Sequence, residues 1–311
     1  MPGQKVDVQK PINYASLKGR NVLVTGGASG LGKNMVRMFA EHGANVVIAD
    51  LQDSLGKVVE QELAGQGGKI KYIHADVTSF DSQVNMLKET LAFFPRNEID
   101  IFVPNAGILS PPTQIVPQDP AGLADLKTPP PDLSAKVIGV NLSGVYVGTM
   151  LVARYGMGLH KGQVSKPAKA IVLIASLAGY CGAEGSVEYT TTKFGVRGLL
   201  RGLRKQLAGL GVRLNAVAPF YVETPMTTDA VGALKSVGIP TAPIEYVTEA
   251  IARLATDETA YGRSVFVMPE GLSDGGDDSA GGQGGESFSL KGLGEHWAVL
   301  VNGPMSDEVG S

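Results

Sequence analysis

The sequence lacks the residues that mark disulfide-bonded, metal-binding or nucleic-acid-binding proteins. Its 311 residues include one cysteine, Cys181, so no disulfide can form within the chain, which fits a reducing compartment. The four histidines are scattered and form neither an HExxH motif nor a Cys/His cluster, so we expect no catalytic metal. Lysine and arginine (27) nearly balance aspartate and glutamate (30), which argues against nucleic acid or an anionic membrane as a partner.

Long hydrophobic runs are also missing. No 18 apolar residues stand together, and the first 20 residues contain no apolar stretch typical of a signal peptide. We therefore expect no membrane span and predict a cytoplasmic protein. The content of 43% hydrophobic and 18% charged residues is that of an ordinary globular protein.

Short β-branched runs alternate with helical patterns along most of the chain. The runs are continuously apolar, which is typical of strands buried on both faces of a parallel sheet. This order predicts an α/β fold, a single doubly wound Rossmann domain with a seven-stranded parallel sheet and helices on both faces. The expected strands are residues 21–26, 45–50, 69–76, 100–107, 169–176, 212–219 and 264–269.

Composition divides the chain further. We expect an N-terminal extension (1–16), the Rossmann domain (17–270) with a substrate lid at about 220–245, and a glycine-rich linker with a C-terminal tail (271–311). Residues 108–135 are rich in proline and predict an extended loop.

The stretch "VLVTGGASGLGKNMV" places Gly26, Gly30 and Gly32 between the first strand and a helix. Glycines allow a tight turn and a close backbone approach to a pyrophosphate, and the helix N-terminus offers free N–H groups. The pattern predicts a dinucleotide site; a plain strand–helix turn is the alternative.

Asp50 ends the second expected strand. A carboxylate there can bind both ribose hydroxyls and repels a 2′-phosphate, and Ser29 supplies no positive charge to bind one, so NAD is favoured over NADP. A helix N-cap is the alternative role for Asp50. Asp76 and Val77, which end the third strand, are expected at the adenine.

Tyr189 and Lys193 are four residues apart and share one face of a helix. A nearby ammonium lowers the pKa of a phenol, and an oxidised, cationic nicotinamide lowers it further, so Tyr189 can act as a general base or acid. Surface packing is the alternative explanation for such a pair.

Together these motifs resemble the short-chain dehydrogenase/reductase family from about Leu17 to Met268. The matching residues are Thr25-Gly26-x-x-x-Gly30-x-Gly32, Asn105-Ala106-Gly107, Asn141, Ser176 and Tyr189-x-x-x-Lys193. The segments "YTTTKFGVRGLLR" and "PNAGI" are most similar to a fungal branch related to 15-hydroxyprostaglandin dehydrogenase, which includes hydroxyaverantin-type dehydrogenases.

The resemblance implies roles for the matching residues. Tyr189 is the general acid/base, Lys193 holds the nicotinamide ribose, and Ser176 donates to the substrate oxygen. Asn141 is expected to perturb its helix and to hold a water that relays a proton from Lys193. The cofactor-binding set is Gly26, Ser29, Gly30, Leu31, Gly32, Asp50, Leu51, Asp76, Val77, Asn105, Ala106, Gly107, Tyr189, Lys193, Pro219, Val222 and Thr224.

One departure concerns Phe220, which stands where the family usually has glycine. Either the backbone is strained there or the ring packs near the nicotinamide. Tyr180, Phe220 and Met226 are the expected substrate contacts, and the apolar lid predicts a hydrophobic alcohol or ketone. We interpret Cys181 as a small hydrophobic residue and not as a reactive thiol.

The sequence thus predicts an NAD(H)-dependent oxidoreductase that interconverts a hydrophobic secondary alcohol and its ketone. Alternatives are an NADPH-dependent ketoreductase of secondary metabolism, a redox-inactive binding protein on the same fold, and a sugar-nucleotide epimerase or dehydratase, whose larger C-terminal domain the chain lacks. The helices 132–158 and 188–209 are apolar on more than one face, and family members commonly pair them, so a homodimer or homotetramer is expected.

Overall fold

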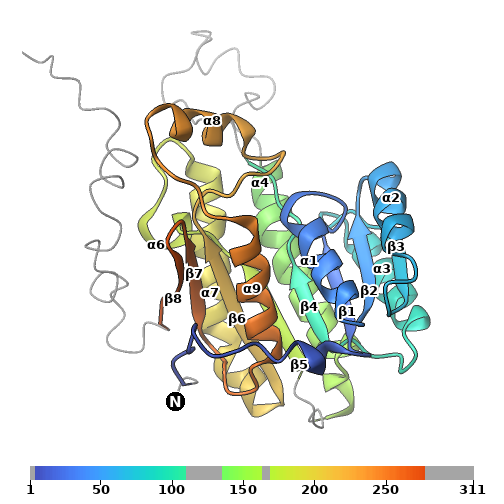
Figure 1. Cartoon of the computed structure of the whole chain (residues 1–311). Helices are drawn as coiled ribbons and strands as arrows, with labels where there is room; N and C mark the ends of the chain where they lie inside the picture. The colour runs from blue at the N-terminus through green and yellow to red at the C-terminus, as the bar shows by residue number, and fades with distance from the viewer. Residues whose placement is uncertain (1–3, 110–134, 163–168, 277–311) are drawn as a thin grey trace, which may run out of the picture.

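The structure, a computed structural model, describes residues 4–109, 135–162 and 169–276 (Figure 1). Strands and helices alternate along most of these residues, as the sequence predicts. The strands are β1 (Asn21–Thr25), β2 (Asn45–Asp50), β3 (Ile70–His74), β4 (Ile101–Pro104), β5 (Lys169–Ile174), β6 (Val212–Pro219), β7 (Ser264–Met268) and β8 (Gly271–Asp274).

These eight strands form one sheet in the order β3-β2-β1-β4-β5-β6-β7-β8. Strands β1 to β7 are parallel, and β8 runs antiparallel to β7. The predicted strand count of seven was therefore one too low, because β8 lies in residues assigned to a linker. Its sequence, Gly-Leu-Ser-Asp, has little β propensity; tertiary contacts hold it, since Asp274 accepts hydrogen bonds from the N–H of Val6 (2.9 Å) and from Nε of Arg263 (3.2 Å).

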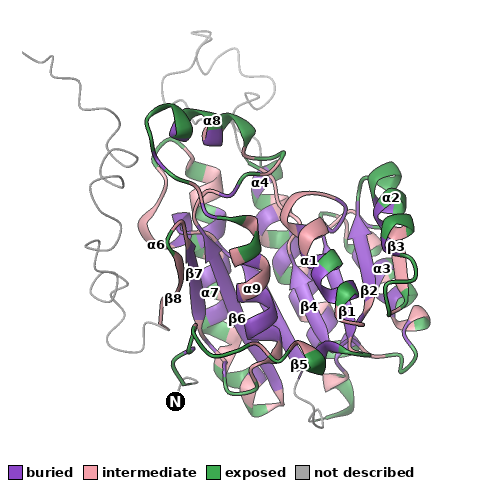
Figure 2. Ribbon diagram, viewed as in Figure 1, coloured by how far each residue is buried: buried purple, intermediate pink, exposed green. Residues whose placement is uncertain are grey.

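The central strands are buried over their full length, which explains their continuous apolar sequences. Every residue of β1, β5 and β6 is buried (Figure 2). The strand order reverses between β1 and β4, and a reversal of this kind opens a crevice at the carboxyl ends of the strands.

Helices cover both faces of the sheet and complete three layers. One face is covered by α1 (Gly30–Glu41), α2 (Asp53–Leu63) and α9 (Ile244–Thr256), and the other by α3 (Phe80–Phe93), α5 (Val145–Leu151) and α7 (Val187–Gly209). The short helices α4 (Lys136–Ile138), α6 (Ala178–Cys181) and α8 (Thr228–Ser236) lie toward the carboxyl ends of the strands (Figure 1). The single-turn 3₁₀ helices are Tyr14–Leu17 and Leu159–Lys161.

The helix that spans residues 136–156 is irregular. It contains two π-helical segments, Gly139–Gly144 and Val152–Gly156, on either side of α5. The predicted perturbation of the helix at Asn141 is thus confirmed. By length and mean hydropathy (1.4) the helix could cross a membrane, but it packs against α3, β4 and α7, as a core helix of this fold does.

Two sequence predictions fall largely on residues that the structure does not describe. The proline-rich loop is outside at 110–134, and the C-terminal tail is outside from residue 277. Of the N-terminal extension, residues 4–16 are described. Val6 is buried there, and Nη1 of Arg253 on α9 donates to the carbonyl of Asp7 (3.1 Å), so the extension packs onto the domain.

Candidate active site

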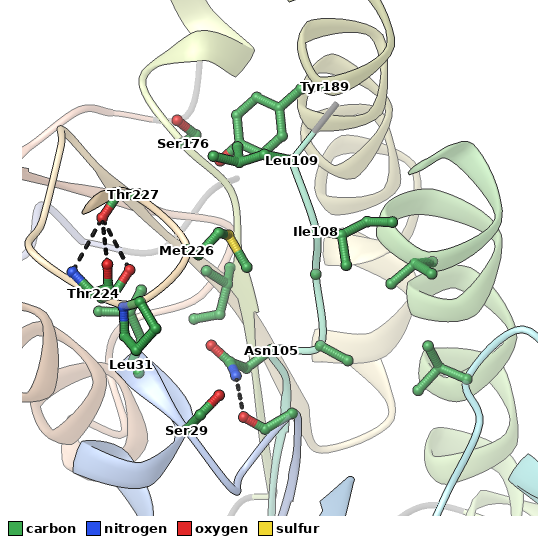
Figure 3. A pocket seen from close by; sticks show the side chains of 18 of the residues that line it. Ser29, Leu31, Asn105, Ile108, Leu109, Ser176, Tyr189, Thr224, Met226 and Thr227 are labelled. Atoms are coloured by element: carbon green, nitrogen blue, oxygen red, sulfur yellow. Dashed lines mark hydrogen bonds between the residues drawn. The ribbon is translucent and has the colours of Figure 1, made fainter. Parts of the chain in front are cut away.

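A cavity of about 390 Å³ opens at the carboxyl ends of β1 to β6, where the strand order reverses. Ser29 and Asn105 lie at one end of the view in Figure 3, and Ser176 and Tyr189 lie at the other. The predicted residues that line it are Gly26, Ser29, Gly30, Leu31, Asp50, Leu51, Asp76, Val77, Asn105, Ala106, Gly107, Ser176, Tyr189, Lys193, Pro219, Phe220, Val222, Thr224 and Met226.

The glycine loop between β1 and α1 is shaped so that only glycine fits. Gly26 and Gly30 have φ of 65° and 51°, in the left-handed region. Gly32 does not line the cavity but lies directly under the turn, where a Cβ would stand 1.9 Å from the carbonyl oxygen of Gly26. The first turn of α1 carries no acidic side chain, so its N–H groups and positive dipole end are left for an anion.

Thr25 and Asn105 hold the ends of β1 and β4 in register beneath this loop. Oγ1 of Thr25 accepts the N–H groups of Asn105 (3.1 Å) and Ala106 (3.2 Å), and Nδ2 of Asn105 donates to the carbonyls of Thr25 and Gly26 (3.0 Å each). The Asn105 amide is thus committed to shaping the floor of the cavity.

The carboxylate of Asp50 is buried and turned toward the glycine loop. Oδ2 accepts the N–H of Ala28 (3.0 Å) and Oδ1 accepts the N–H of Gln52 (3.0 Å). Asp50 is not the N-cap of α2, which begins one residue after Gln52. Each oxygen keeps a second lone pair, so the carboxylate can still accept hydroxyl groups from the cavity.

Asp76 lies nearby, at the end that we assign to the adenine. Its Oδ1 accepts the N–H (2.8 Å) and the hydroxyl (2.7 Å) of Thr78, and these bonds hold the pKa of Asp76 below its usual value. Asp76 therefore presents an ionised acceptor to the cavity.

These features suit a nicotinamide dinucleotide. The glycine loop leaves a space that a Cβ at Gly32 would obstruct, and the N-terminus of α1 can bind a pyrophosphate. The carboxylates of Asp50 and Asp76 can accept hydrogen bonds from the ribose and the adenine. Residues 26–32 would hold the phosphates, Asp50 the adenosine ribose, and Lys193 the nicotinamide ribose.

At the other end, Ser176 after β5 and Tyr189 on α7 both line the cavity, and the Ser176 hydroxyl lowers the pKa of Tyr189. Oγ of Ser176 also accepts the N–H of Ala178 (3.2 Å). Nζ of Lys193 donates to the carbonyl of Ile174 (2.9 Å) and lies 5.3 Å from the centroid of the Tyr189 ring. The four-residue spacing thus brings the two side chains to the same end of the cavity.

Burial is the largest influence on both ionisable groups. It raises the pKa of Tyr189 to about 12, against the lowering effect of Ser176, and it lowers the pKa of Lys193 to about 8. The predicted lowering of the Tyr189 pKa by Lys193 is not seen, because the ammonium points to the Ile174 carbonyl.

Asn141 does not line the cavity. Its Oδ1 accepts the N–H of Ile108 and its Nδ2 donates to the carbonyl of Ile108, each at 2.8 Å. The side-chain amide therefore holds the chain that follows β4. The predicted water relay to Lys193 stays a prediction.

Phe220 lines the cavity with an ordinary backbone: among the described residues Asn97 alone, glycines aside, has a positive φ. The strain considered for this position is therefore absent. Further along, Oγ1 of Thr227 accepts the N–H of Thr224 (3.1 Å) and donates to the carbonyl of Val222 (2.5 Å), so it fixes the entrance to the lid helix α8 (Figure 3).

Tyr180, a predicted substrate contact, does not line the cavity. Its hydroxyl donates to Oγ of Ser264 on β7, away from Ser176. The short helix α6 turns the side chain toward the sheet, which the sequence could not show.

Sequence reasoning also missed cavity residues. Ile108 and Leu109 directly follow the Asn-Ala-Gly motif and could have been inferred from it, whereas Lys136 and Val140 come from a distant helix. The full set of missed residues is Gln52, Ala75, Ile108, Leu109, Lys136, Val140, Ile174, Ala175, Pro225 and Thr227.

Comparison with known proteins agrees with this geometry. Residues 20–234 match the short chain dehydrogenase family. The chain is 35% identical to 5′-hydroxyaverantin dehydrogenase of Dothistroma septosporum, over 89% of this chain and 93% of that protein. It is 34% identical to the mitochondrial borneol dehydrogenase of Lavandula x intermedia, over 79% and 86%.

Among solved structures, 3-ketoacyl-(acyl-carrier-protein) reductase from Brucella melitensis, determined in complex with NADH, superposes with a TM-score of 0.68 at 27% identity. The match covers 81% of this chain and 98% of that protein. The chain therefore belongs to the short-chain dehydrogenase/reductase family and is an oxidoreductase that acts on CH–OH groups with a nicotinamide dinucleotide.

Proposed function

We propose that the protein is an NAD(H)-dependent dehydrogenase of a hydrophobic secondary alcohol, with Tyr189 as its general acid/base. The observation that carries the proposal is one continuous cavity. At one end it offers the glycine loop and Asp50, and at the other Ser176, Tyr189 and Lys193.

The reaction assigns one task to each side chain. Oγ of Ser176 holds the substrate oxygen, and Oη of Tyr189 takes the hydroxyl proton during oxidation and returns it during reduction. An ammonium has three donors and Ile174 uses one, so Lys193 keeps two with which to hold a ribose. The nicotinamide, when bound, supplies the hydride acceptor or donor.

NAD is favoured over NADP by the charge at the adenosine end. Asp50 is buried against the loop and cannot easily turn away from a 2′-phosphate, because both carboxylate oxygens hold backbone N–H groups. The residues beside it in the cavity, Leu51 and Gln52, carry no positive charge. A preference for NADP in binding assays would favour the alternative, an NADPH-dependent ketoreductase.

The substrate end supports an apolar substrate. Ile108, Leu109, Phe220 and Met226 line the cavity, Leu109 lies beside Tyr189 in Figure 3, and Met226 is 47% exposed. The related proteins named above are dehydrogenases of hydroxyaverantin and of borneol, whose names fit the same class. Faster turnover of a phosphorylated sugar than of any lipophilic alcohol would contradict this part of the proposal.

The test is the appearance of reduced-nicotinamide absorbance when the purified protein is mixed with NAD or NADP and a panel of lipophilic secondary alcohols. Tyr189→Phe should lower kcat by at least about a hundredfold, because the general base is lost. Tyr246→Phe is the matched control, since Tyr246 lies on α9 and does not line the cavity. Full activity in Tyr189→Phe would rule out the assigned role, and NADH binding without turnover would favour a redox-inactive binding protein.

We also propose that two copies of the chain associate through the helices 136–156 and α7. Both carry large apolar or aromatic side chains that are exposed to water and that association would bury. They are Ile138, Tyr146, Tyr155, Val187 and Phe194. Sedimentation velocity should show a dimer or tetramer, and a monomer at micromolar concentration would contradict it.

A further inference from the structure

The helix α6 lies between the two reacting side chains along the sequence, and Tyr180 anchors it to the sheet. The Tyr180 hydroxyl donates to Oγ of Ser264 at 2.5 Å. Its ring meets the ring of Phe266 edge-on, with centroids 4.7 Å apart, and the guanidinium carbon of Arg197 stands 4.4 Å from its centroid. Tyr180 thus joins α6 to β7 and to α7 at once.

The same helix is pressed against the backbone of the catalytic helix. A Cβ on Gly179 would lie 2.6 Å from the carbonyl oxygen of Lys193, so the two backbones touch at the lysine itself. Nη1 of Arg197 reaches the carbonyl of Gly179 at 3.5 Å. A displacement of α6 therefore changes its fit against α7 at the position of Lys193.

Ser176 depends on this helix for its position. Its side chain accepts the N–H of Ala178 at 3.2 Å and donates to the carbonyl of Pro219 at only 3.4 Å, and its carbonyl accepts the N–H of Gly179 at 2.9 Å. A helix of four residues is too short to be stable by itself, so its position must come from outside contacts.

We propose that Tyr180, held by Ser264 and Arg197, is a positioning residue that fixes Ser176 against Tyr189 and so sets the geometry of proton transfer. The inference rests on the proposed function of this site. It also explains why a tyrosine close to Ser176 faces away from the cavity: its contacts are with the sheet and α7, and its effect on the reaction passes through α6.

The ionisation of Tyr189 reports on this positioning. Two side chains act on its pKa besides burial: Ser176 lowers it and Tyr221 after β6 raises it, while Lys193 lies over its ring. If α6 shifts and Ser176 moves away from Tyr189, the pKa of Tyr189 rises. Alcohol oxidation near neutral pH then slows, because less phenolate is present.

The experiment compares the wild type with Tyr180→Phe, Ser264→Ala and the double variant. Each should lower kcat by about fivefold, the value of one hydrogen bond, with the KM for NAD unchanged. The rise of kcat with pH should move to higher pH in all three, and the double variant should be no slower than either single variant.

Stability separates positioning from a merely structural role. Ser264→Ala leaves the Tyr180 hydroxyl without a partner and should lower Tm most, whereas the double variant removes both partners and should recover much of that loss. Activity should stay low in the double variant although Tm recovers. Activity that follows Tm across the four proteins, or a Tyr180→Phe enzyme with wild-type kcat and pH profile, would overturn the inference.

If the wild type is inactive, the proposed function is refuted for the alcohols tested. The positioning role of Tyr180 can then still be tested without turnover. The ultraviolet absorbance of tyrosinate can be titrated with NAD bound, with the Tyr189→Phe version of each protein subtracted as reference. The difference gives the Tyr189 pKa with and without the Tyr180 hydroxyl. A higher pKa in Tyr180→Phe supports positioning, and an equal pKa overturns it.

Discussion

Both ends of the Asn141 side-chain amide are hydrogen-bonded to one residue, Ile108: Oδ1 to its N–H and Nδ2 to its carbonyl, each at 2.8 Å. This pair joins the π-helical segment Gly139–Gly144 to the chain that leaves β4 and lines the cavity. Through these two hydrogen bonds, the Asn141 amide holds the chain after β4 in place as one wall of the active site.

Asn141→Asp is expected to destabilise the protein by about 1–3 kcal/mol at neutral pH. One carboxylate oxygen would face the Ile108 carbonyl, and the charge would be buried, since Asn141 is 1% exposed. A buried carboxyl has a raised pKa, so the folded state binds the proton more tightly than the unfolded state. The loss should therefore shrink as the pH falls toward about 4, where a protonated carboxyl can again donate to Ile108.

Urea unfolding at several pH values measures this effect. Gln66→Glu is the control, because Gln66 is exposed and its side chain has no hydrogen bond in the described structure. A loss that stays constant with pH would contradict the assigned pairing.

Lys193→Met is expected to abolish NAD-dependent turnover and yet to stabilise the fold near neutral pH. Burial lowers the pKa of Lys193 from 10.5 to about 8, so the folded protein binds this proton less tightly than the unfolded chain. The charged lysine therefore destabilises the fold below about pH 8, and stability is regained as the pH rises toward 10.5. After subtraction of the lost bond to Ile174, the variant should gain about 2 kcal/mol.

Thermal unfolding at about pH 7 and about pH 10 tests the sign, because the gain should disappear at the higher pH. Lys205→Met, an exposed position on the same helix, should show no such dependence. A variant less stable than the wild type at neutral pH would show that the bond to Ile174 outweighs the cost of burying the charge.

Asp50→Asn is expected to change cofactor choice and stability together. The loss of charge should raise the KM for NAD and lower the KM for NADP, each by roughly tenfold, because a 2′-phosphate is no longer repelled. Since both oxygens of Asp50 accept backbone N–H groups, the new NH₂ must face a donor, which costs about 1–2 kcal/mol. Steady-state kinetics with both cofactors measures the first effect and urea unfolding the second.

Asp81→Asn, an exposed carboxylate in the first turn of α3, is the control for a change of charge alone. If Asp50→Asn keeps the wild-type ratio of kcat/KM for NAD to kcat/KM for NADP, another group determines the cofactor preference.

Gly32→Ala is expected to weaken NADH binding by more than about tenfold, because its Cβ would stand 1.9 Å from the Gly26 carbonyl oxygen and must push the loop out of shape. Gly202→Ala is the matched control: this exposed glycine of α7 has nothing within 4 Å of its added Cβ. The control should gain about 0.5–1 kcal/mol of stability, since alanine favours a helix. Fluorescence titration with NADH measures the binding, and unchanged affinity in Gly32→Ala would contradict the role of the loop.

Much of the fold was predictable from local pattern. Continuous apolar runs placed β1 to β7 within a few residues of their ends, because a strand buried on both faces must be apolar throughout. The glycine loop and the Tyr189–Lys193 pair were equally visible, since their geometry depends on spacing of six and four residues along one segment.

Contacts between distant segments had no such local sign. The strand β8 has a sequence with low β propensity and exists because it pairs with β7 and because Asp274 binds Val6. Tyr180 follows Ser176 by four residues and was expected beside the substrate, yet its hydroxyl meets Ser264, 84 residues away. Residue type and spacing thus determined the fold class, the family and the reacting groups, because those follow from periodicity and from chemistry within one segment. Tertiary structure alone decided which side chains face the cavity and which hold it in place, because that depends on how separate elements pack.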